Sequence, residues 1–158
     1  MSEKEIQKIL SEMDVKLNEI NKPDKYGNTP LFYADTAEEV KALLAAGANV
    51  NYQTEDKDTP LFSAVREDNS VVAKLLIDAG ANVNAIDEFN HTPLFDAKSA
   101  EMVDVLVKGG VDIDHIDDHE FGGTALDHMQ YLLENDHDIN KEKLKKAIDA
   151  LKISKTQR

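Results

Sequence analysis

Two histidines, His115 and His119, lie four residues apart with Asp117 and Asp118 between them. Imidazole nitrogens and carboxylate oxygens are ligands that zinc and other transition metals accept. On a helix, a spacing of four would place both imidazoles on one face. The surrounding pattern predicts a loop, where spacing does not fix geometry, and a metal site needs a complete, well-supported ligand set. We therefore predict no metal site and no cofactor.

Other signatures of catalysis are missing from the sequence. A calcium loop beginning at Asp112 fails, because Ile116 stands where an oxygen ligand belongs and Gly123 where a bidentate glutamate belongs. There is no glycine-rich phosphate loop and no Gly-x-Ser-x-Gly turn. The absence of cysteine excludes disulfides and thiol nucleophiles. We predict that the protein is not an enzyme.

The charge of the chain is strongly acidic and unevenly distributed. Eighteen basic and 31 acidic residues give a net charge of −13. Between Gly110 and Asn140 there are nine acids and no Lys or Arg. Such a field repels nucleic acid and anionic membranes and attracts a basic protein. We predict a basic protein partner, no nucleic acid and no membrane.

The N-terminus favours a cytoplasmic location. It reads Met-Ser-Glu-Lys-Glu-Ile, with acidic residues where a secretory signal has basic and then apolar ones. No apolar run approaches the ~20 residues that cross a bilayer. We therefore expect the protein to be cytoplasmic.

A repeated tetrapeptide organises these residues. Thr-Pro-Leu-Phe begins at Thr29, Thr59 and Thr92, and a degenerate copy begins at Thr124, with spacings of 30, 33 and 32 residues. Thr29, Thr59 and Thr92 are each predicted to cap a helix through the hydroxyl, with Pro at the first helical position. A second helix follows, with apolar pairs at Leu43/Leu44, Leu76/Ile77 and Leu106/Val107, and ends at a left-handed glycine: Gly47, Gly80 and Gly110.

From about Asp24 to Asn140, this pattern of Thr-Pro-Leu-x-x-Ala, a Leu-Leu helix and Gly-Ala-Asn-Val-Asn resembles the ankyrin repeat. The resemblance implies a mainly α fold, a solenoid of helix pairs with β-hairpin fingers and helical caps at both ends. We expect one domain over residues 1–158. Its expected parts are an N-terminal capping helix (2–21), repeats at 24–53, 54–86 and 87–116, and a fourth repeat or C-terminal cap (117–152).

The chain also departs from that pattern. From Thr to the capping Gly, repeats one and three span 18 residues and repeat two spans 21, so the first helices of repeats one and three, or the connections after them, should be shortened. Lys57 and Asn90 stand at the usual turn glycine. At the ends we expect a helix from Glu3 to Asn18, with a Ser2–Glu5 capping box and Leu17 on its buried face. We also expect a last helix from Lys141 to Lys152 and a frayed tail at 154–158.

The resemblance implies that partners dock on the finger tips and on the first helices of the concave side. The residues at those positions are Tyr26, Tyr33, Glu55, Asp56, Asp58, Arg66, Glu88, Phe89, His91, Ser99, Asp117, Asp118, His119, Glu120 and Phe121. Aromatic side chains flanked by acids are typical of recognition surfaces. The sequence leaves open whether each ring contacts a partner or only braces the neighbouring finger.

We therefore interpret the chain as a non-catalytic protein–protein interaction module that is monomeric when free. It is similar to the short ankyrin proteins that bacteria encode beside polymorphic toxins. That resemblance implies an immunity protein that occludes a basic toxin, such as a nuclease. The alternative is a regulatory scaffold or effector adaptor that tethers another cellular protein.

Overall fold

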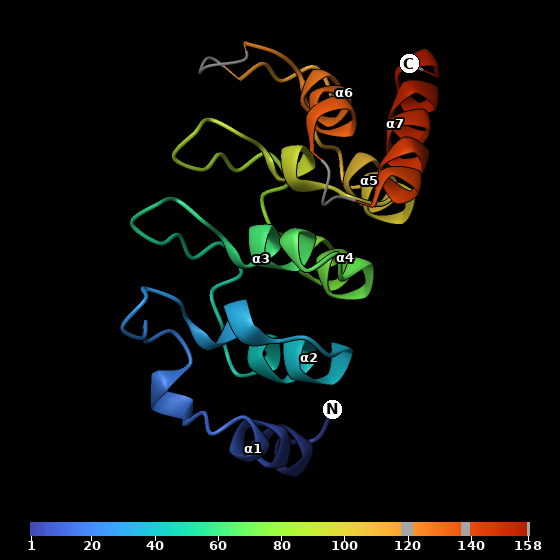
Figure 1. Ribbon diagram of the computed structural model, residues 1–158. Helices are drawn as coiled ribbons and strands as arrows, with labels where there is room; N and C mark the ends of the chain where they lie inside the picture. The colour runs from blue at the N-terminus through green and yellow to red at the C-terminus, as the bar shows by residue number, and fades with distance from the viewer. Residues whose placement is uncertain (118–121, 137–139, 158) are drawn as a thin grey trace.

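The computed structural model describes residues 1–117, 122–136 and 140–157, and within them the fold is mainly helical. Figure 1 shows the helices in successive layers from the N-terminus to the C-terminus, with loops projecting to one side. The helices are α1 (Glu3–Glu12), η1 (Leu17–Glu19), η2 (Pro30–Tyr33), α2 (Ala37–Ala45), α3 (Pro60–Arg66), α4 (Ser70–Asp78), η3 (Pro93–Asp96), α5 (Ala100–Lys108), α6 (Ala125–Asn135) and α7 (Lys141–Thr156), where η denotes a 3₁₀-helix.

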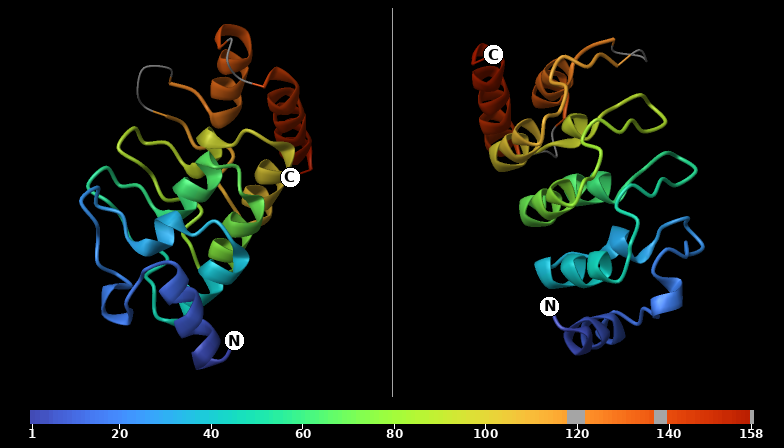
Figure 2. Two further views of the ribbon diagram at one scale, coloured as in Figure 1. Left: turned by 60° about the horizontal axis from the view of Figure 1, so that its bottom comes forward. Right: turned by 180° about the vertical axis from the view of Figure 1, so that it is seen from behind.

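Each layer pairs a first helical segment with a second helix: η2 with α2, α3 with α4, η3 with α5, and α6 with α7. The second helices α2, α4 and α5 stack on one side, and the loops between layers project from the other (Figure 2). A single apolar core runs through all layers, as shown by the buried residues Leu10, Leu43, Leu76, Leu106 and Leu151. Among the helices of residues 1–117, 122–136 and 140–157, none is long and apolar enough to span a membrane.

The second helices begin and end as local sequence chemistry requires. Thr36 caps α2 in a capping box with Glu39, while Asn69 caps α4 and Ser99 caps α5. The predicted glycine ends are confirmed, since Gly47, Gly80 and Gly110 have φ of 91°, 91° and 89°. At the end of α2, for example, the amides of Gly47 and Ala48 donate to helix carbonyls at 3.0 and 2.9 Å, which satisfies the last turn.

The first helical segments begin at the repeated prolines, as predicted, but the threonine hydroxyls do not cap them. Thr29, Thr59 and Thr92 have extended backbones and make no side-chain capping bond. Their side chains are 1–3% exposed, packed in the interior rather than over the first turn. Among the described residues, the hydroxyls of Thr59 and Thr92 have no hydrogen-bond partner at all. The capping prediction was therefore wrong.

The shortening of repeats one and three is confirmed. Their first segments, η2 and η3, are four-residue 3₁₀-helices, whereas α3 of repeat two is a seven-residue α-helix. The chain leaves η2 at Ala34, whose ψ of 114° is extended, and reaches the cap of α2 two residues later. Repeat one therefore lacks the additional helical turn that α3 supplies in repeat two.

We call the loop before each repeated Thr a finger: finger 1 (24–28), finger 2 (54–58), finger 3 (87–91) and finger 4 (117–123, of which 118–121 lie outside the described residues). A backbone hydrogen bond closes each one, such as Asp24 N to Asn28 O at 2.9 Å. The described residues form no β-strand, only an isolated bridge between Ile116 and Thr124, so the expected hairpins are not confirmed. Lys57 and Asn90 keep the left-handed turn, with φ of 63° and 61°.

Both ends of the chain differ from the prediction. The Ser2–Glu5 capping box is confirmed, but α1 ends at Glu12, not Asn18. Asp14 is left-handed (φ 55°) and the Val15 amide bonds back to the Leu10 carbonyl at 2.8 Å, so Leu17 is exposed rather than buried. The last helix, α7, continues to Thr156, so the prediction of a frayed tail was wrong over residues 154–156. The repeat boundaries themselves stay predictions.

Candidate functional site

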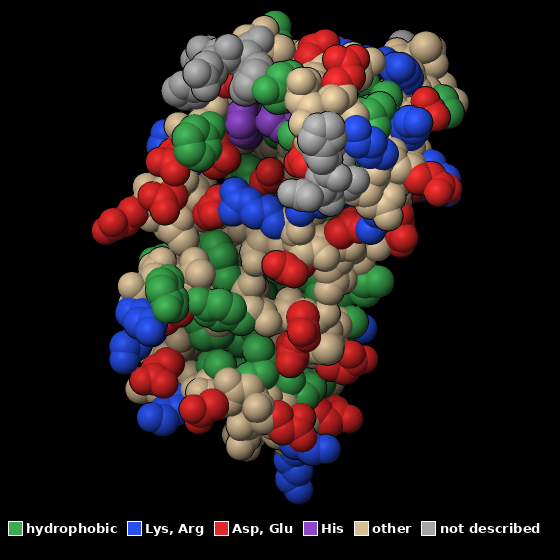
Figure 3. Space-filling model, viewed as in Figure 1, with side chains coloured by type: hydrophobic (Ala, Val, Ile, Leu, Met, Phe, Trp, Pro, Cys, Tyr) green, Lys and Arg blue, Asp and Glu red, His purple; other side chains and the backbone are tan. Residues whose placement is uncertain are grey.

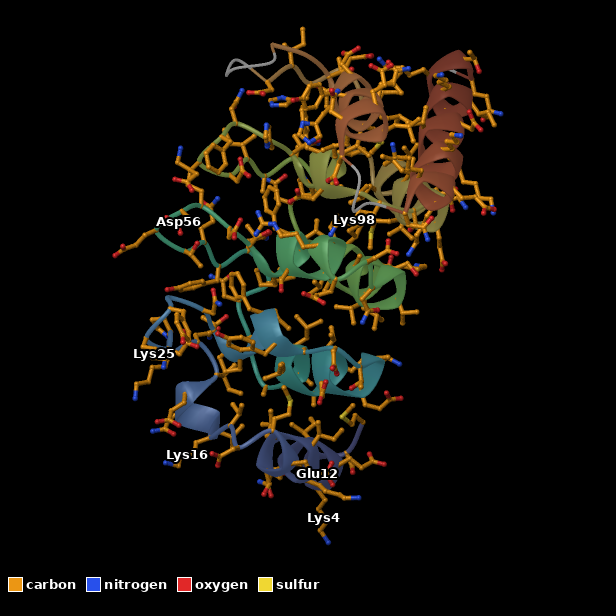
Figure 4. All side chains as sticks on the ribbon, viewed as in Figure 1. Lys4, Glu12, Lys16, Lys25, Asp56 and Lys98 are labelled. Carbon is orange, nitrogen blue, oxygen red and sulfur yellow. The ribbon has the colours of Figure 1, made fainter. Side chains whose placement is uncertain are left out.

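Three aromatic side chains stand exposed on the finger side of the molecule. Tyr26 is 70% exposed at finger 1, and Tyr33 and Phe89 are each 54% exposed, at η2 and finger 3. The acids Glu55, Asp56 and Glu88 are exposed on fingers 2 and 3. Figure 4 shows Lys25 and Asp56 at the outer ends of fingers 1 and 2. Six of the predicted site residues thus lie on one accessible side.

The Tyr33 ring is held by finger 1. Its hydroxyl donates to Asp24 Oδ2 at 2.6 Å and accepts from Asn28 Nδ2 at 3.1 Å. Asp24 Oδ1 in turn accepts the amides of Tyr26 and Asn28, at 2.8 and 3.1 Å. The hydrogen bond from Tyr33 lowers the pKa of Asp24, and the same contact raises the pKa of Tyr33. Finger 1 and η2 therefore present Tyr33 in one defined orientation.

Arg66, at the end of α3, joins fingers 2 and 3. Two of its nitrogens bind Asp58 at 2.5 and 2.9 Å, and Nε binds Asp96 at 2.9 Å. A guanidinium nitrogen also lies 3.9 Å from Asp87 Oδ2. Asp58 first and then Asp96 raise the pKa of Arg66. Arg66 lies on the predicted face, but three acids of its own chain offset its charge.

Ser99 is not part of an exposed surface. It is 8% exposed, its hydroxyl caps α5 by accepting the Met102 amide at 3.1 Å, and it donates to Asp68 Oδ1 at 2.6 Å. The prediction failed because the shortening of repeat three moves this register position from a first helix to the start of a second one.

His91 and Asp117 turn inward at the base of fingers 3 and 4. The His91 ring stacks on Phe95, with centroids 4.6 Å apart and planes 8° from parallel, and its Nε2 lies 3.2 Å from Asp117 Oδ2. Asp117 is only 2% exposed, so its prediction as a surface contact was wrong. The other predicted residues of finger 4, Asp118, His119, Glu120 and Phe121, lie outside the described residues.

Two more histidines border this stack. His115 meets Phe95 edge-on, and its Nε2 lies 2.7 Å from the Asn90 carbonyl. His128 of α6 lies 5.7 Å from the His91 ring, and burial, with the nearby His91 charge second, lowers its pKa. Within residues 1–117, 122–136 and 140–157, no three histidine or acidic side chains converge as a metal site requires.

Sequence reasoning missed several residues that shape this side. Asp24 and Asp87 open fingers 1 and 3 at one register position, and each accepts two amides of its own finger. Asp96 was also overlooked, although it occupies the register of Tyr33 in repeat three. The repeat alignment contains this signal, because an acid at a finger's first position can bind the amides two and four residues later.

A polar hollow of about 550 Å³ opens between fingers 1 and 2, with Lys25, Tyr26, Tyr52 and Asp56 among its lining residues. Lys25 lies over the Tyr26 ring with its ammonium 4.8 Å from the centroid. Tyr26 is thus 70% exposed beside this hollow.

The layered helix pairs and glycine-ended second helices match a known family. A family model described as ankyrin repeats in three copies matches residues 34–117, more than half of the chain. The chain belongs to the ankyrin repeat family. No curated protein matches it. Ankyrin repeats indicate a protein–protein interaction module and are generally non-catalytic, so the exposed finger side of this ankyrin protein is its candidate binding surface.

Proposed function

We propose that this ankyrin protein binds a basic protein through fingers 1–3 and the first helical segments η2, α3 and η3. These segments carry seven acidic and three basic residues, a net charge of −4. One of the three cations, Arg66, is already bound to Asp58 and Asp96. An acidic surface that also exposes Tyr26, Tyr33 and Phe89 offers a basic partner both electrostatic attraction and aromatic anchors.

The specific form that we propose is an immunity protein that neutralises a toxin by occluding it. A nuclease needs a basic cleft for phosphates, and carboxylates such as Glu55, Asp56 and Glu88 can occupy such a cleft in their place. The net charge of −13 would also accelerate capture. The alternative, a regulatory scaffold or effector adaptor, needs the same surface but no toxin.

Charge reversal on the fingers tests the proposed surface. The protein encoded next to this chain, or one captured from native lysate, is titrated by interferometry against wild type and Glu55→Lys/Asp56→Lys/Glu88→Lys. We expect the association rate constant to fall about tenfold or more at low salt, and less at high salt.

The matched control is Glu12→Lys/Glu38→Lys/Asp149→Lys, which makes the same charge change at exposed positions on α1, α2 and α7. If both variants bind equally, the finger surface is not the site. If the partner is a nuclease that wild type inhibits, the immunity form is supported. A partner without toxic activity favours the scaffold alternative. Sedimentation of the free chain tests the predicted monomer, and cell fractionation tests the predicted cytoplasmic location.

A further inference from the structure

Tyr33 separates two neighbouring hollows on the finger side of the first layers. The first, about 300 Å³, lies between the segment after α1 and finger 1 and has apolar walls from Met13, Val15, Pro23 and Pro30. The second, about 320 Å³, lies between η2 and α3, with apolar walls from Leu31, Phe32, Ala34, Pro60 and Val72. Tyr33 lines both hollows and is 54% exposed, so its ring forms an accessible ridge between them.

The second hollow exists because repeat one is short. η2 has four residues, and the seven-residue α3 extends past it without a matching helical turn. Two hydrogen bonds tie its walls together: Ser63 Oγ to the Phe32 carbonyl at 2.9 Å and Asn69 Nδ2 to the Asp35 carbonyl at 2.8 Å. In the next layer, where η3 is equally short, Arg66 binds Asp96, and Lys98 Nζ donates to the Arg66 carbonyl at 3.1 Å across the corresponding step.

The rims of both hollows are acidic. Asp14, Glu19 and Asp24 line the first hollow, and Asp35 and Glu67 line the second. The first also has Lys22, whose ammonium lies 3.4 Å from Glu19 Oε1. Figure 3 shows hydrophobic side chains gathered in a hollow in the lower half of this face, with acidic side chains at its border. An apolar floor with an acidic rim is complementary to an apolar side chain flanked by basic ones.

We propose that these two hollows hold a segment of the partner that places one apolar side chain on each side of Tyr33 and directs flanking Lys or Arg side chains to the acidic rims. This inference rests on the proposed function and adds the chemistry of the bound segment. Because Asp24 and Asn28 already fix the Tyr33 hydroxyl, little side-chain freedom is lost on binding, which favours Tyr33 as an anchor.

Amide NMR spectra of the full chain test the proposal with a synthetic probe. The probe is a short amidated peptide with leucines flanked by arginines, and its counterpart has glutamates in place of the arginines. We expect the arginine peptide to shift signals of residues that line the hollows and to bind about tenfold or more tightly than the glutamate peptide. Shifts confined to fingers 2 and 3, equal affinity of both peptides, or no binding at millimolar concentration would overturn the proposal.

Variants on either side of the contact locate it. Tyr33→Ala removes the ridge, and Asp35→Lys/Glu67→Lys reverses the rim while leaving the apolar walls in place. Each should lower the affinity for the arginine peptide about tenfold. Glu12→Lys/Glu38→Lys, with the same charge change on α1 and α2, should leave that affinity unchanged. Circular dichroism checks that each variant is folded, and the rim variant still decides if Tyr33→Ala is not. Unchanged affinity of the rim variant contradicts the proposal.

The two proposals fail separately. The finger variant Glu55→Lys/Asp56→Lys/Glu88→Lys should keep the peptide affinity but lose the protein partner. If this variant still binds the protein partner and the peptide binds the hollows, the proposed finger surface is contradicted and the proposed role of the hollows is supported. If this variant no longer binds the protein partner and the peptide does not bind the wild type, only the proposed role of the hollows is contradicted.

Discussion

At the scale of single residues, buried threonine hydroxyls and the exposed Arg66 side chain should affect the free energy of unfolding. The hydroxyls of Thr59 and Thr92 are inside the protein without a hydrogen-bond partner among the described residues. A hydroxyl in that state has lost its water on folding and costs about 1–3 kcal/mol. Thr36 is different, because its hydroxyl accepts the Glu39 amide at 3.2 Å and caps α2. The same residue type thus stabilises at one site and destabilises at another.

Replacing these threonines with valine should separate the two roles. Thr59→Val keeps the shape and removes the unpaired hydroxyl, so we expect the free energy of unfolding to stay equal or rise by up to about 1 kcal/mol. Thr36→Val removes the cap and should lower it by about 1 kcal/mol. Urea unfolding followed by circular dichroism measures both. A marked loss of stability in Thr59→Val would show that its hydroxyl is paired in solution.

Arg66 gives the second prediction at this scale. Arg66→Met leaves Asp58 and Asp96 without their common partner and Asp87 nearby, so we expect a loss of about 1 kcal/mol in urea unfolding, at the upper end for exposed pairs because several carboxylates share the cation. Added salt should reduce the loss, because it screens the repulsion among the acids. Lys74→Met, which breaks an exposed pair with Asp78, is the control and should cost less than about 0.5 kcal/mol. Equal losses in the two variants would mean that the Arg66 contacts add nothing.

At the scale of elements, the lengths of the repeats predicted the helical segments better than side-chain capping chemistry did. Three missing residues in repeats one and three predicted that their first helices or the following connections are short, and η2 and η3 show that the helices are. Apolar periodicity alone predicted that α1 extends to Asn18, because nothing in that pattern signals that Asp14 adopts a left-handed conformation. Asp117 was placed on the surface because register gives a position in a finger but not the direction in which a carboxylate points. Only the folded contact with His91 settles that direction.

The contact between finger 3 and α6 should lower the pKa of His128. Burial lowers its pKa from the ordinary 6.5, and the nearby His91 charge lowers it further. The folded state therefore resists the proton that the unfolded state accepts, so the stability due to neutral His128 is complete above pH 6.5 and is lost as pH falls toward the folded pKa.

NMR of the imidazole protons should give a midpoint for His128 below 6.5. His91→Gln should raise that midpoint, because it removes the neighbouring positive charge, while Asp96 and Asp117 continue to favour the protonated form. A midpoint at or above the ordinary value in wild type would contradict the burial of this ring between finger 3 and α6.

At the scale of the whole molecule, the layered architecture could be predicted from the sequence because every layer repeats one local pattern. A period of about 30 residues, a proline start and a glycine end are all visible in a single chain. The candidate binding surface was harder to predict from the sequence, because it depends on which side chains pair across layers. Arg66 shows this, since its partners lie in finger 2 and η3. The second hollow beside Tyr33 arises from a difference in length between η2 and α3 in adjacent layers, which no single repeat contains.

A stack in which each layer contacts mainly its neighbours should lose stability mostly locally, although Lys143 of α7 also binds Asp68 of the second layer. Leu10 of α1 and Leu151 of α7 are 2% and 0% exposed at opposite ends, so each change to Ala should cost about 2–4 kcal/mol. Amide hydrogen exchange should then show Leu10→Ala lowering protection in α1 and α2 but not in α5 and α7, and Leu151→Ala the reverse. Equal loss of protection along the chain in either variant would mean that the ankyrin stack unfolds as one cooperative unit instead.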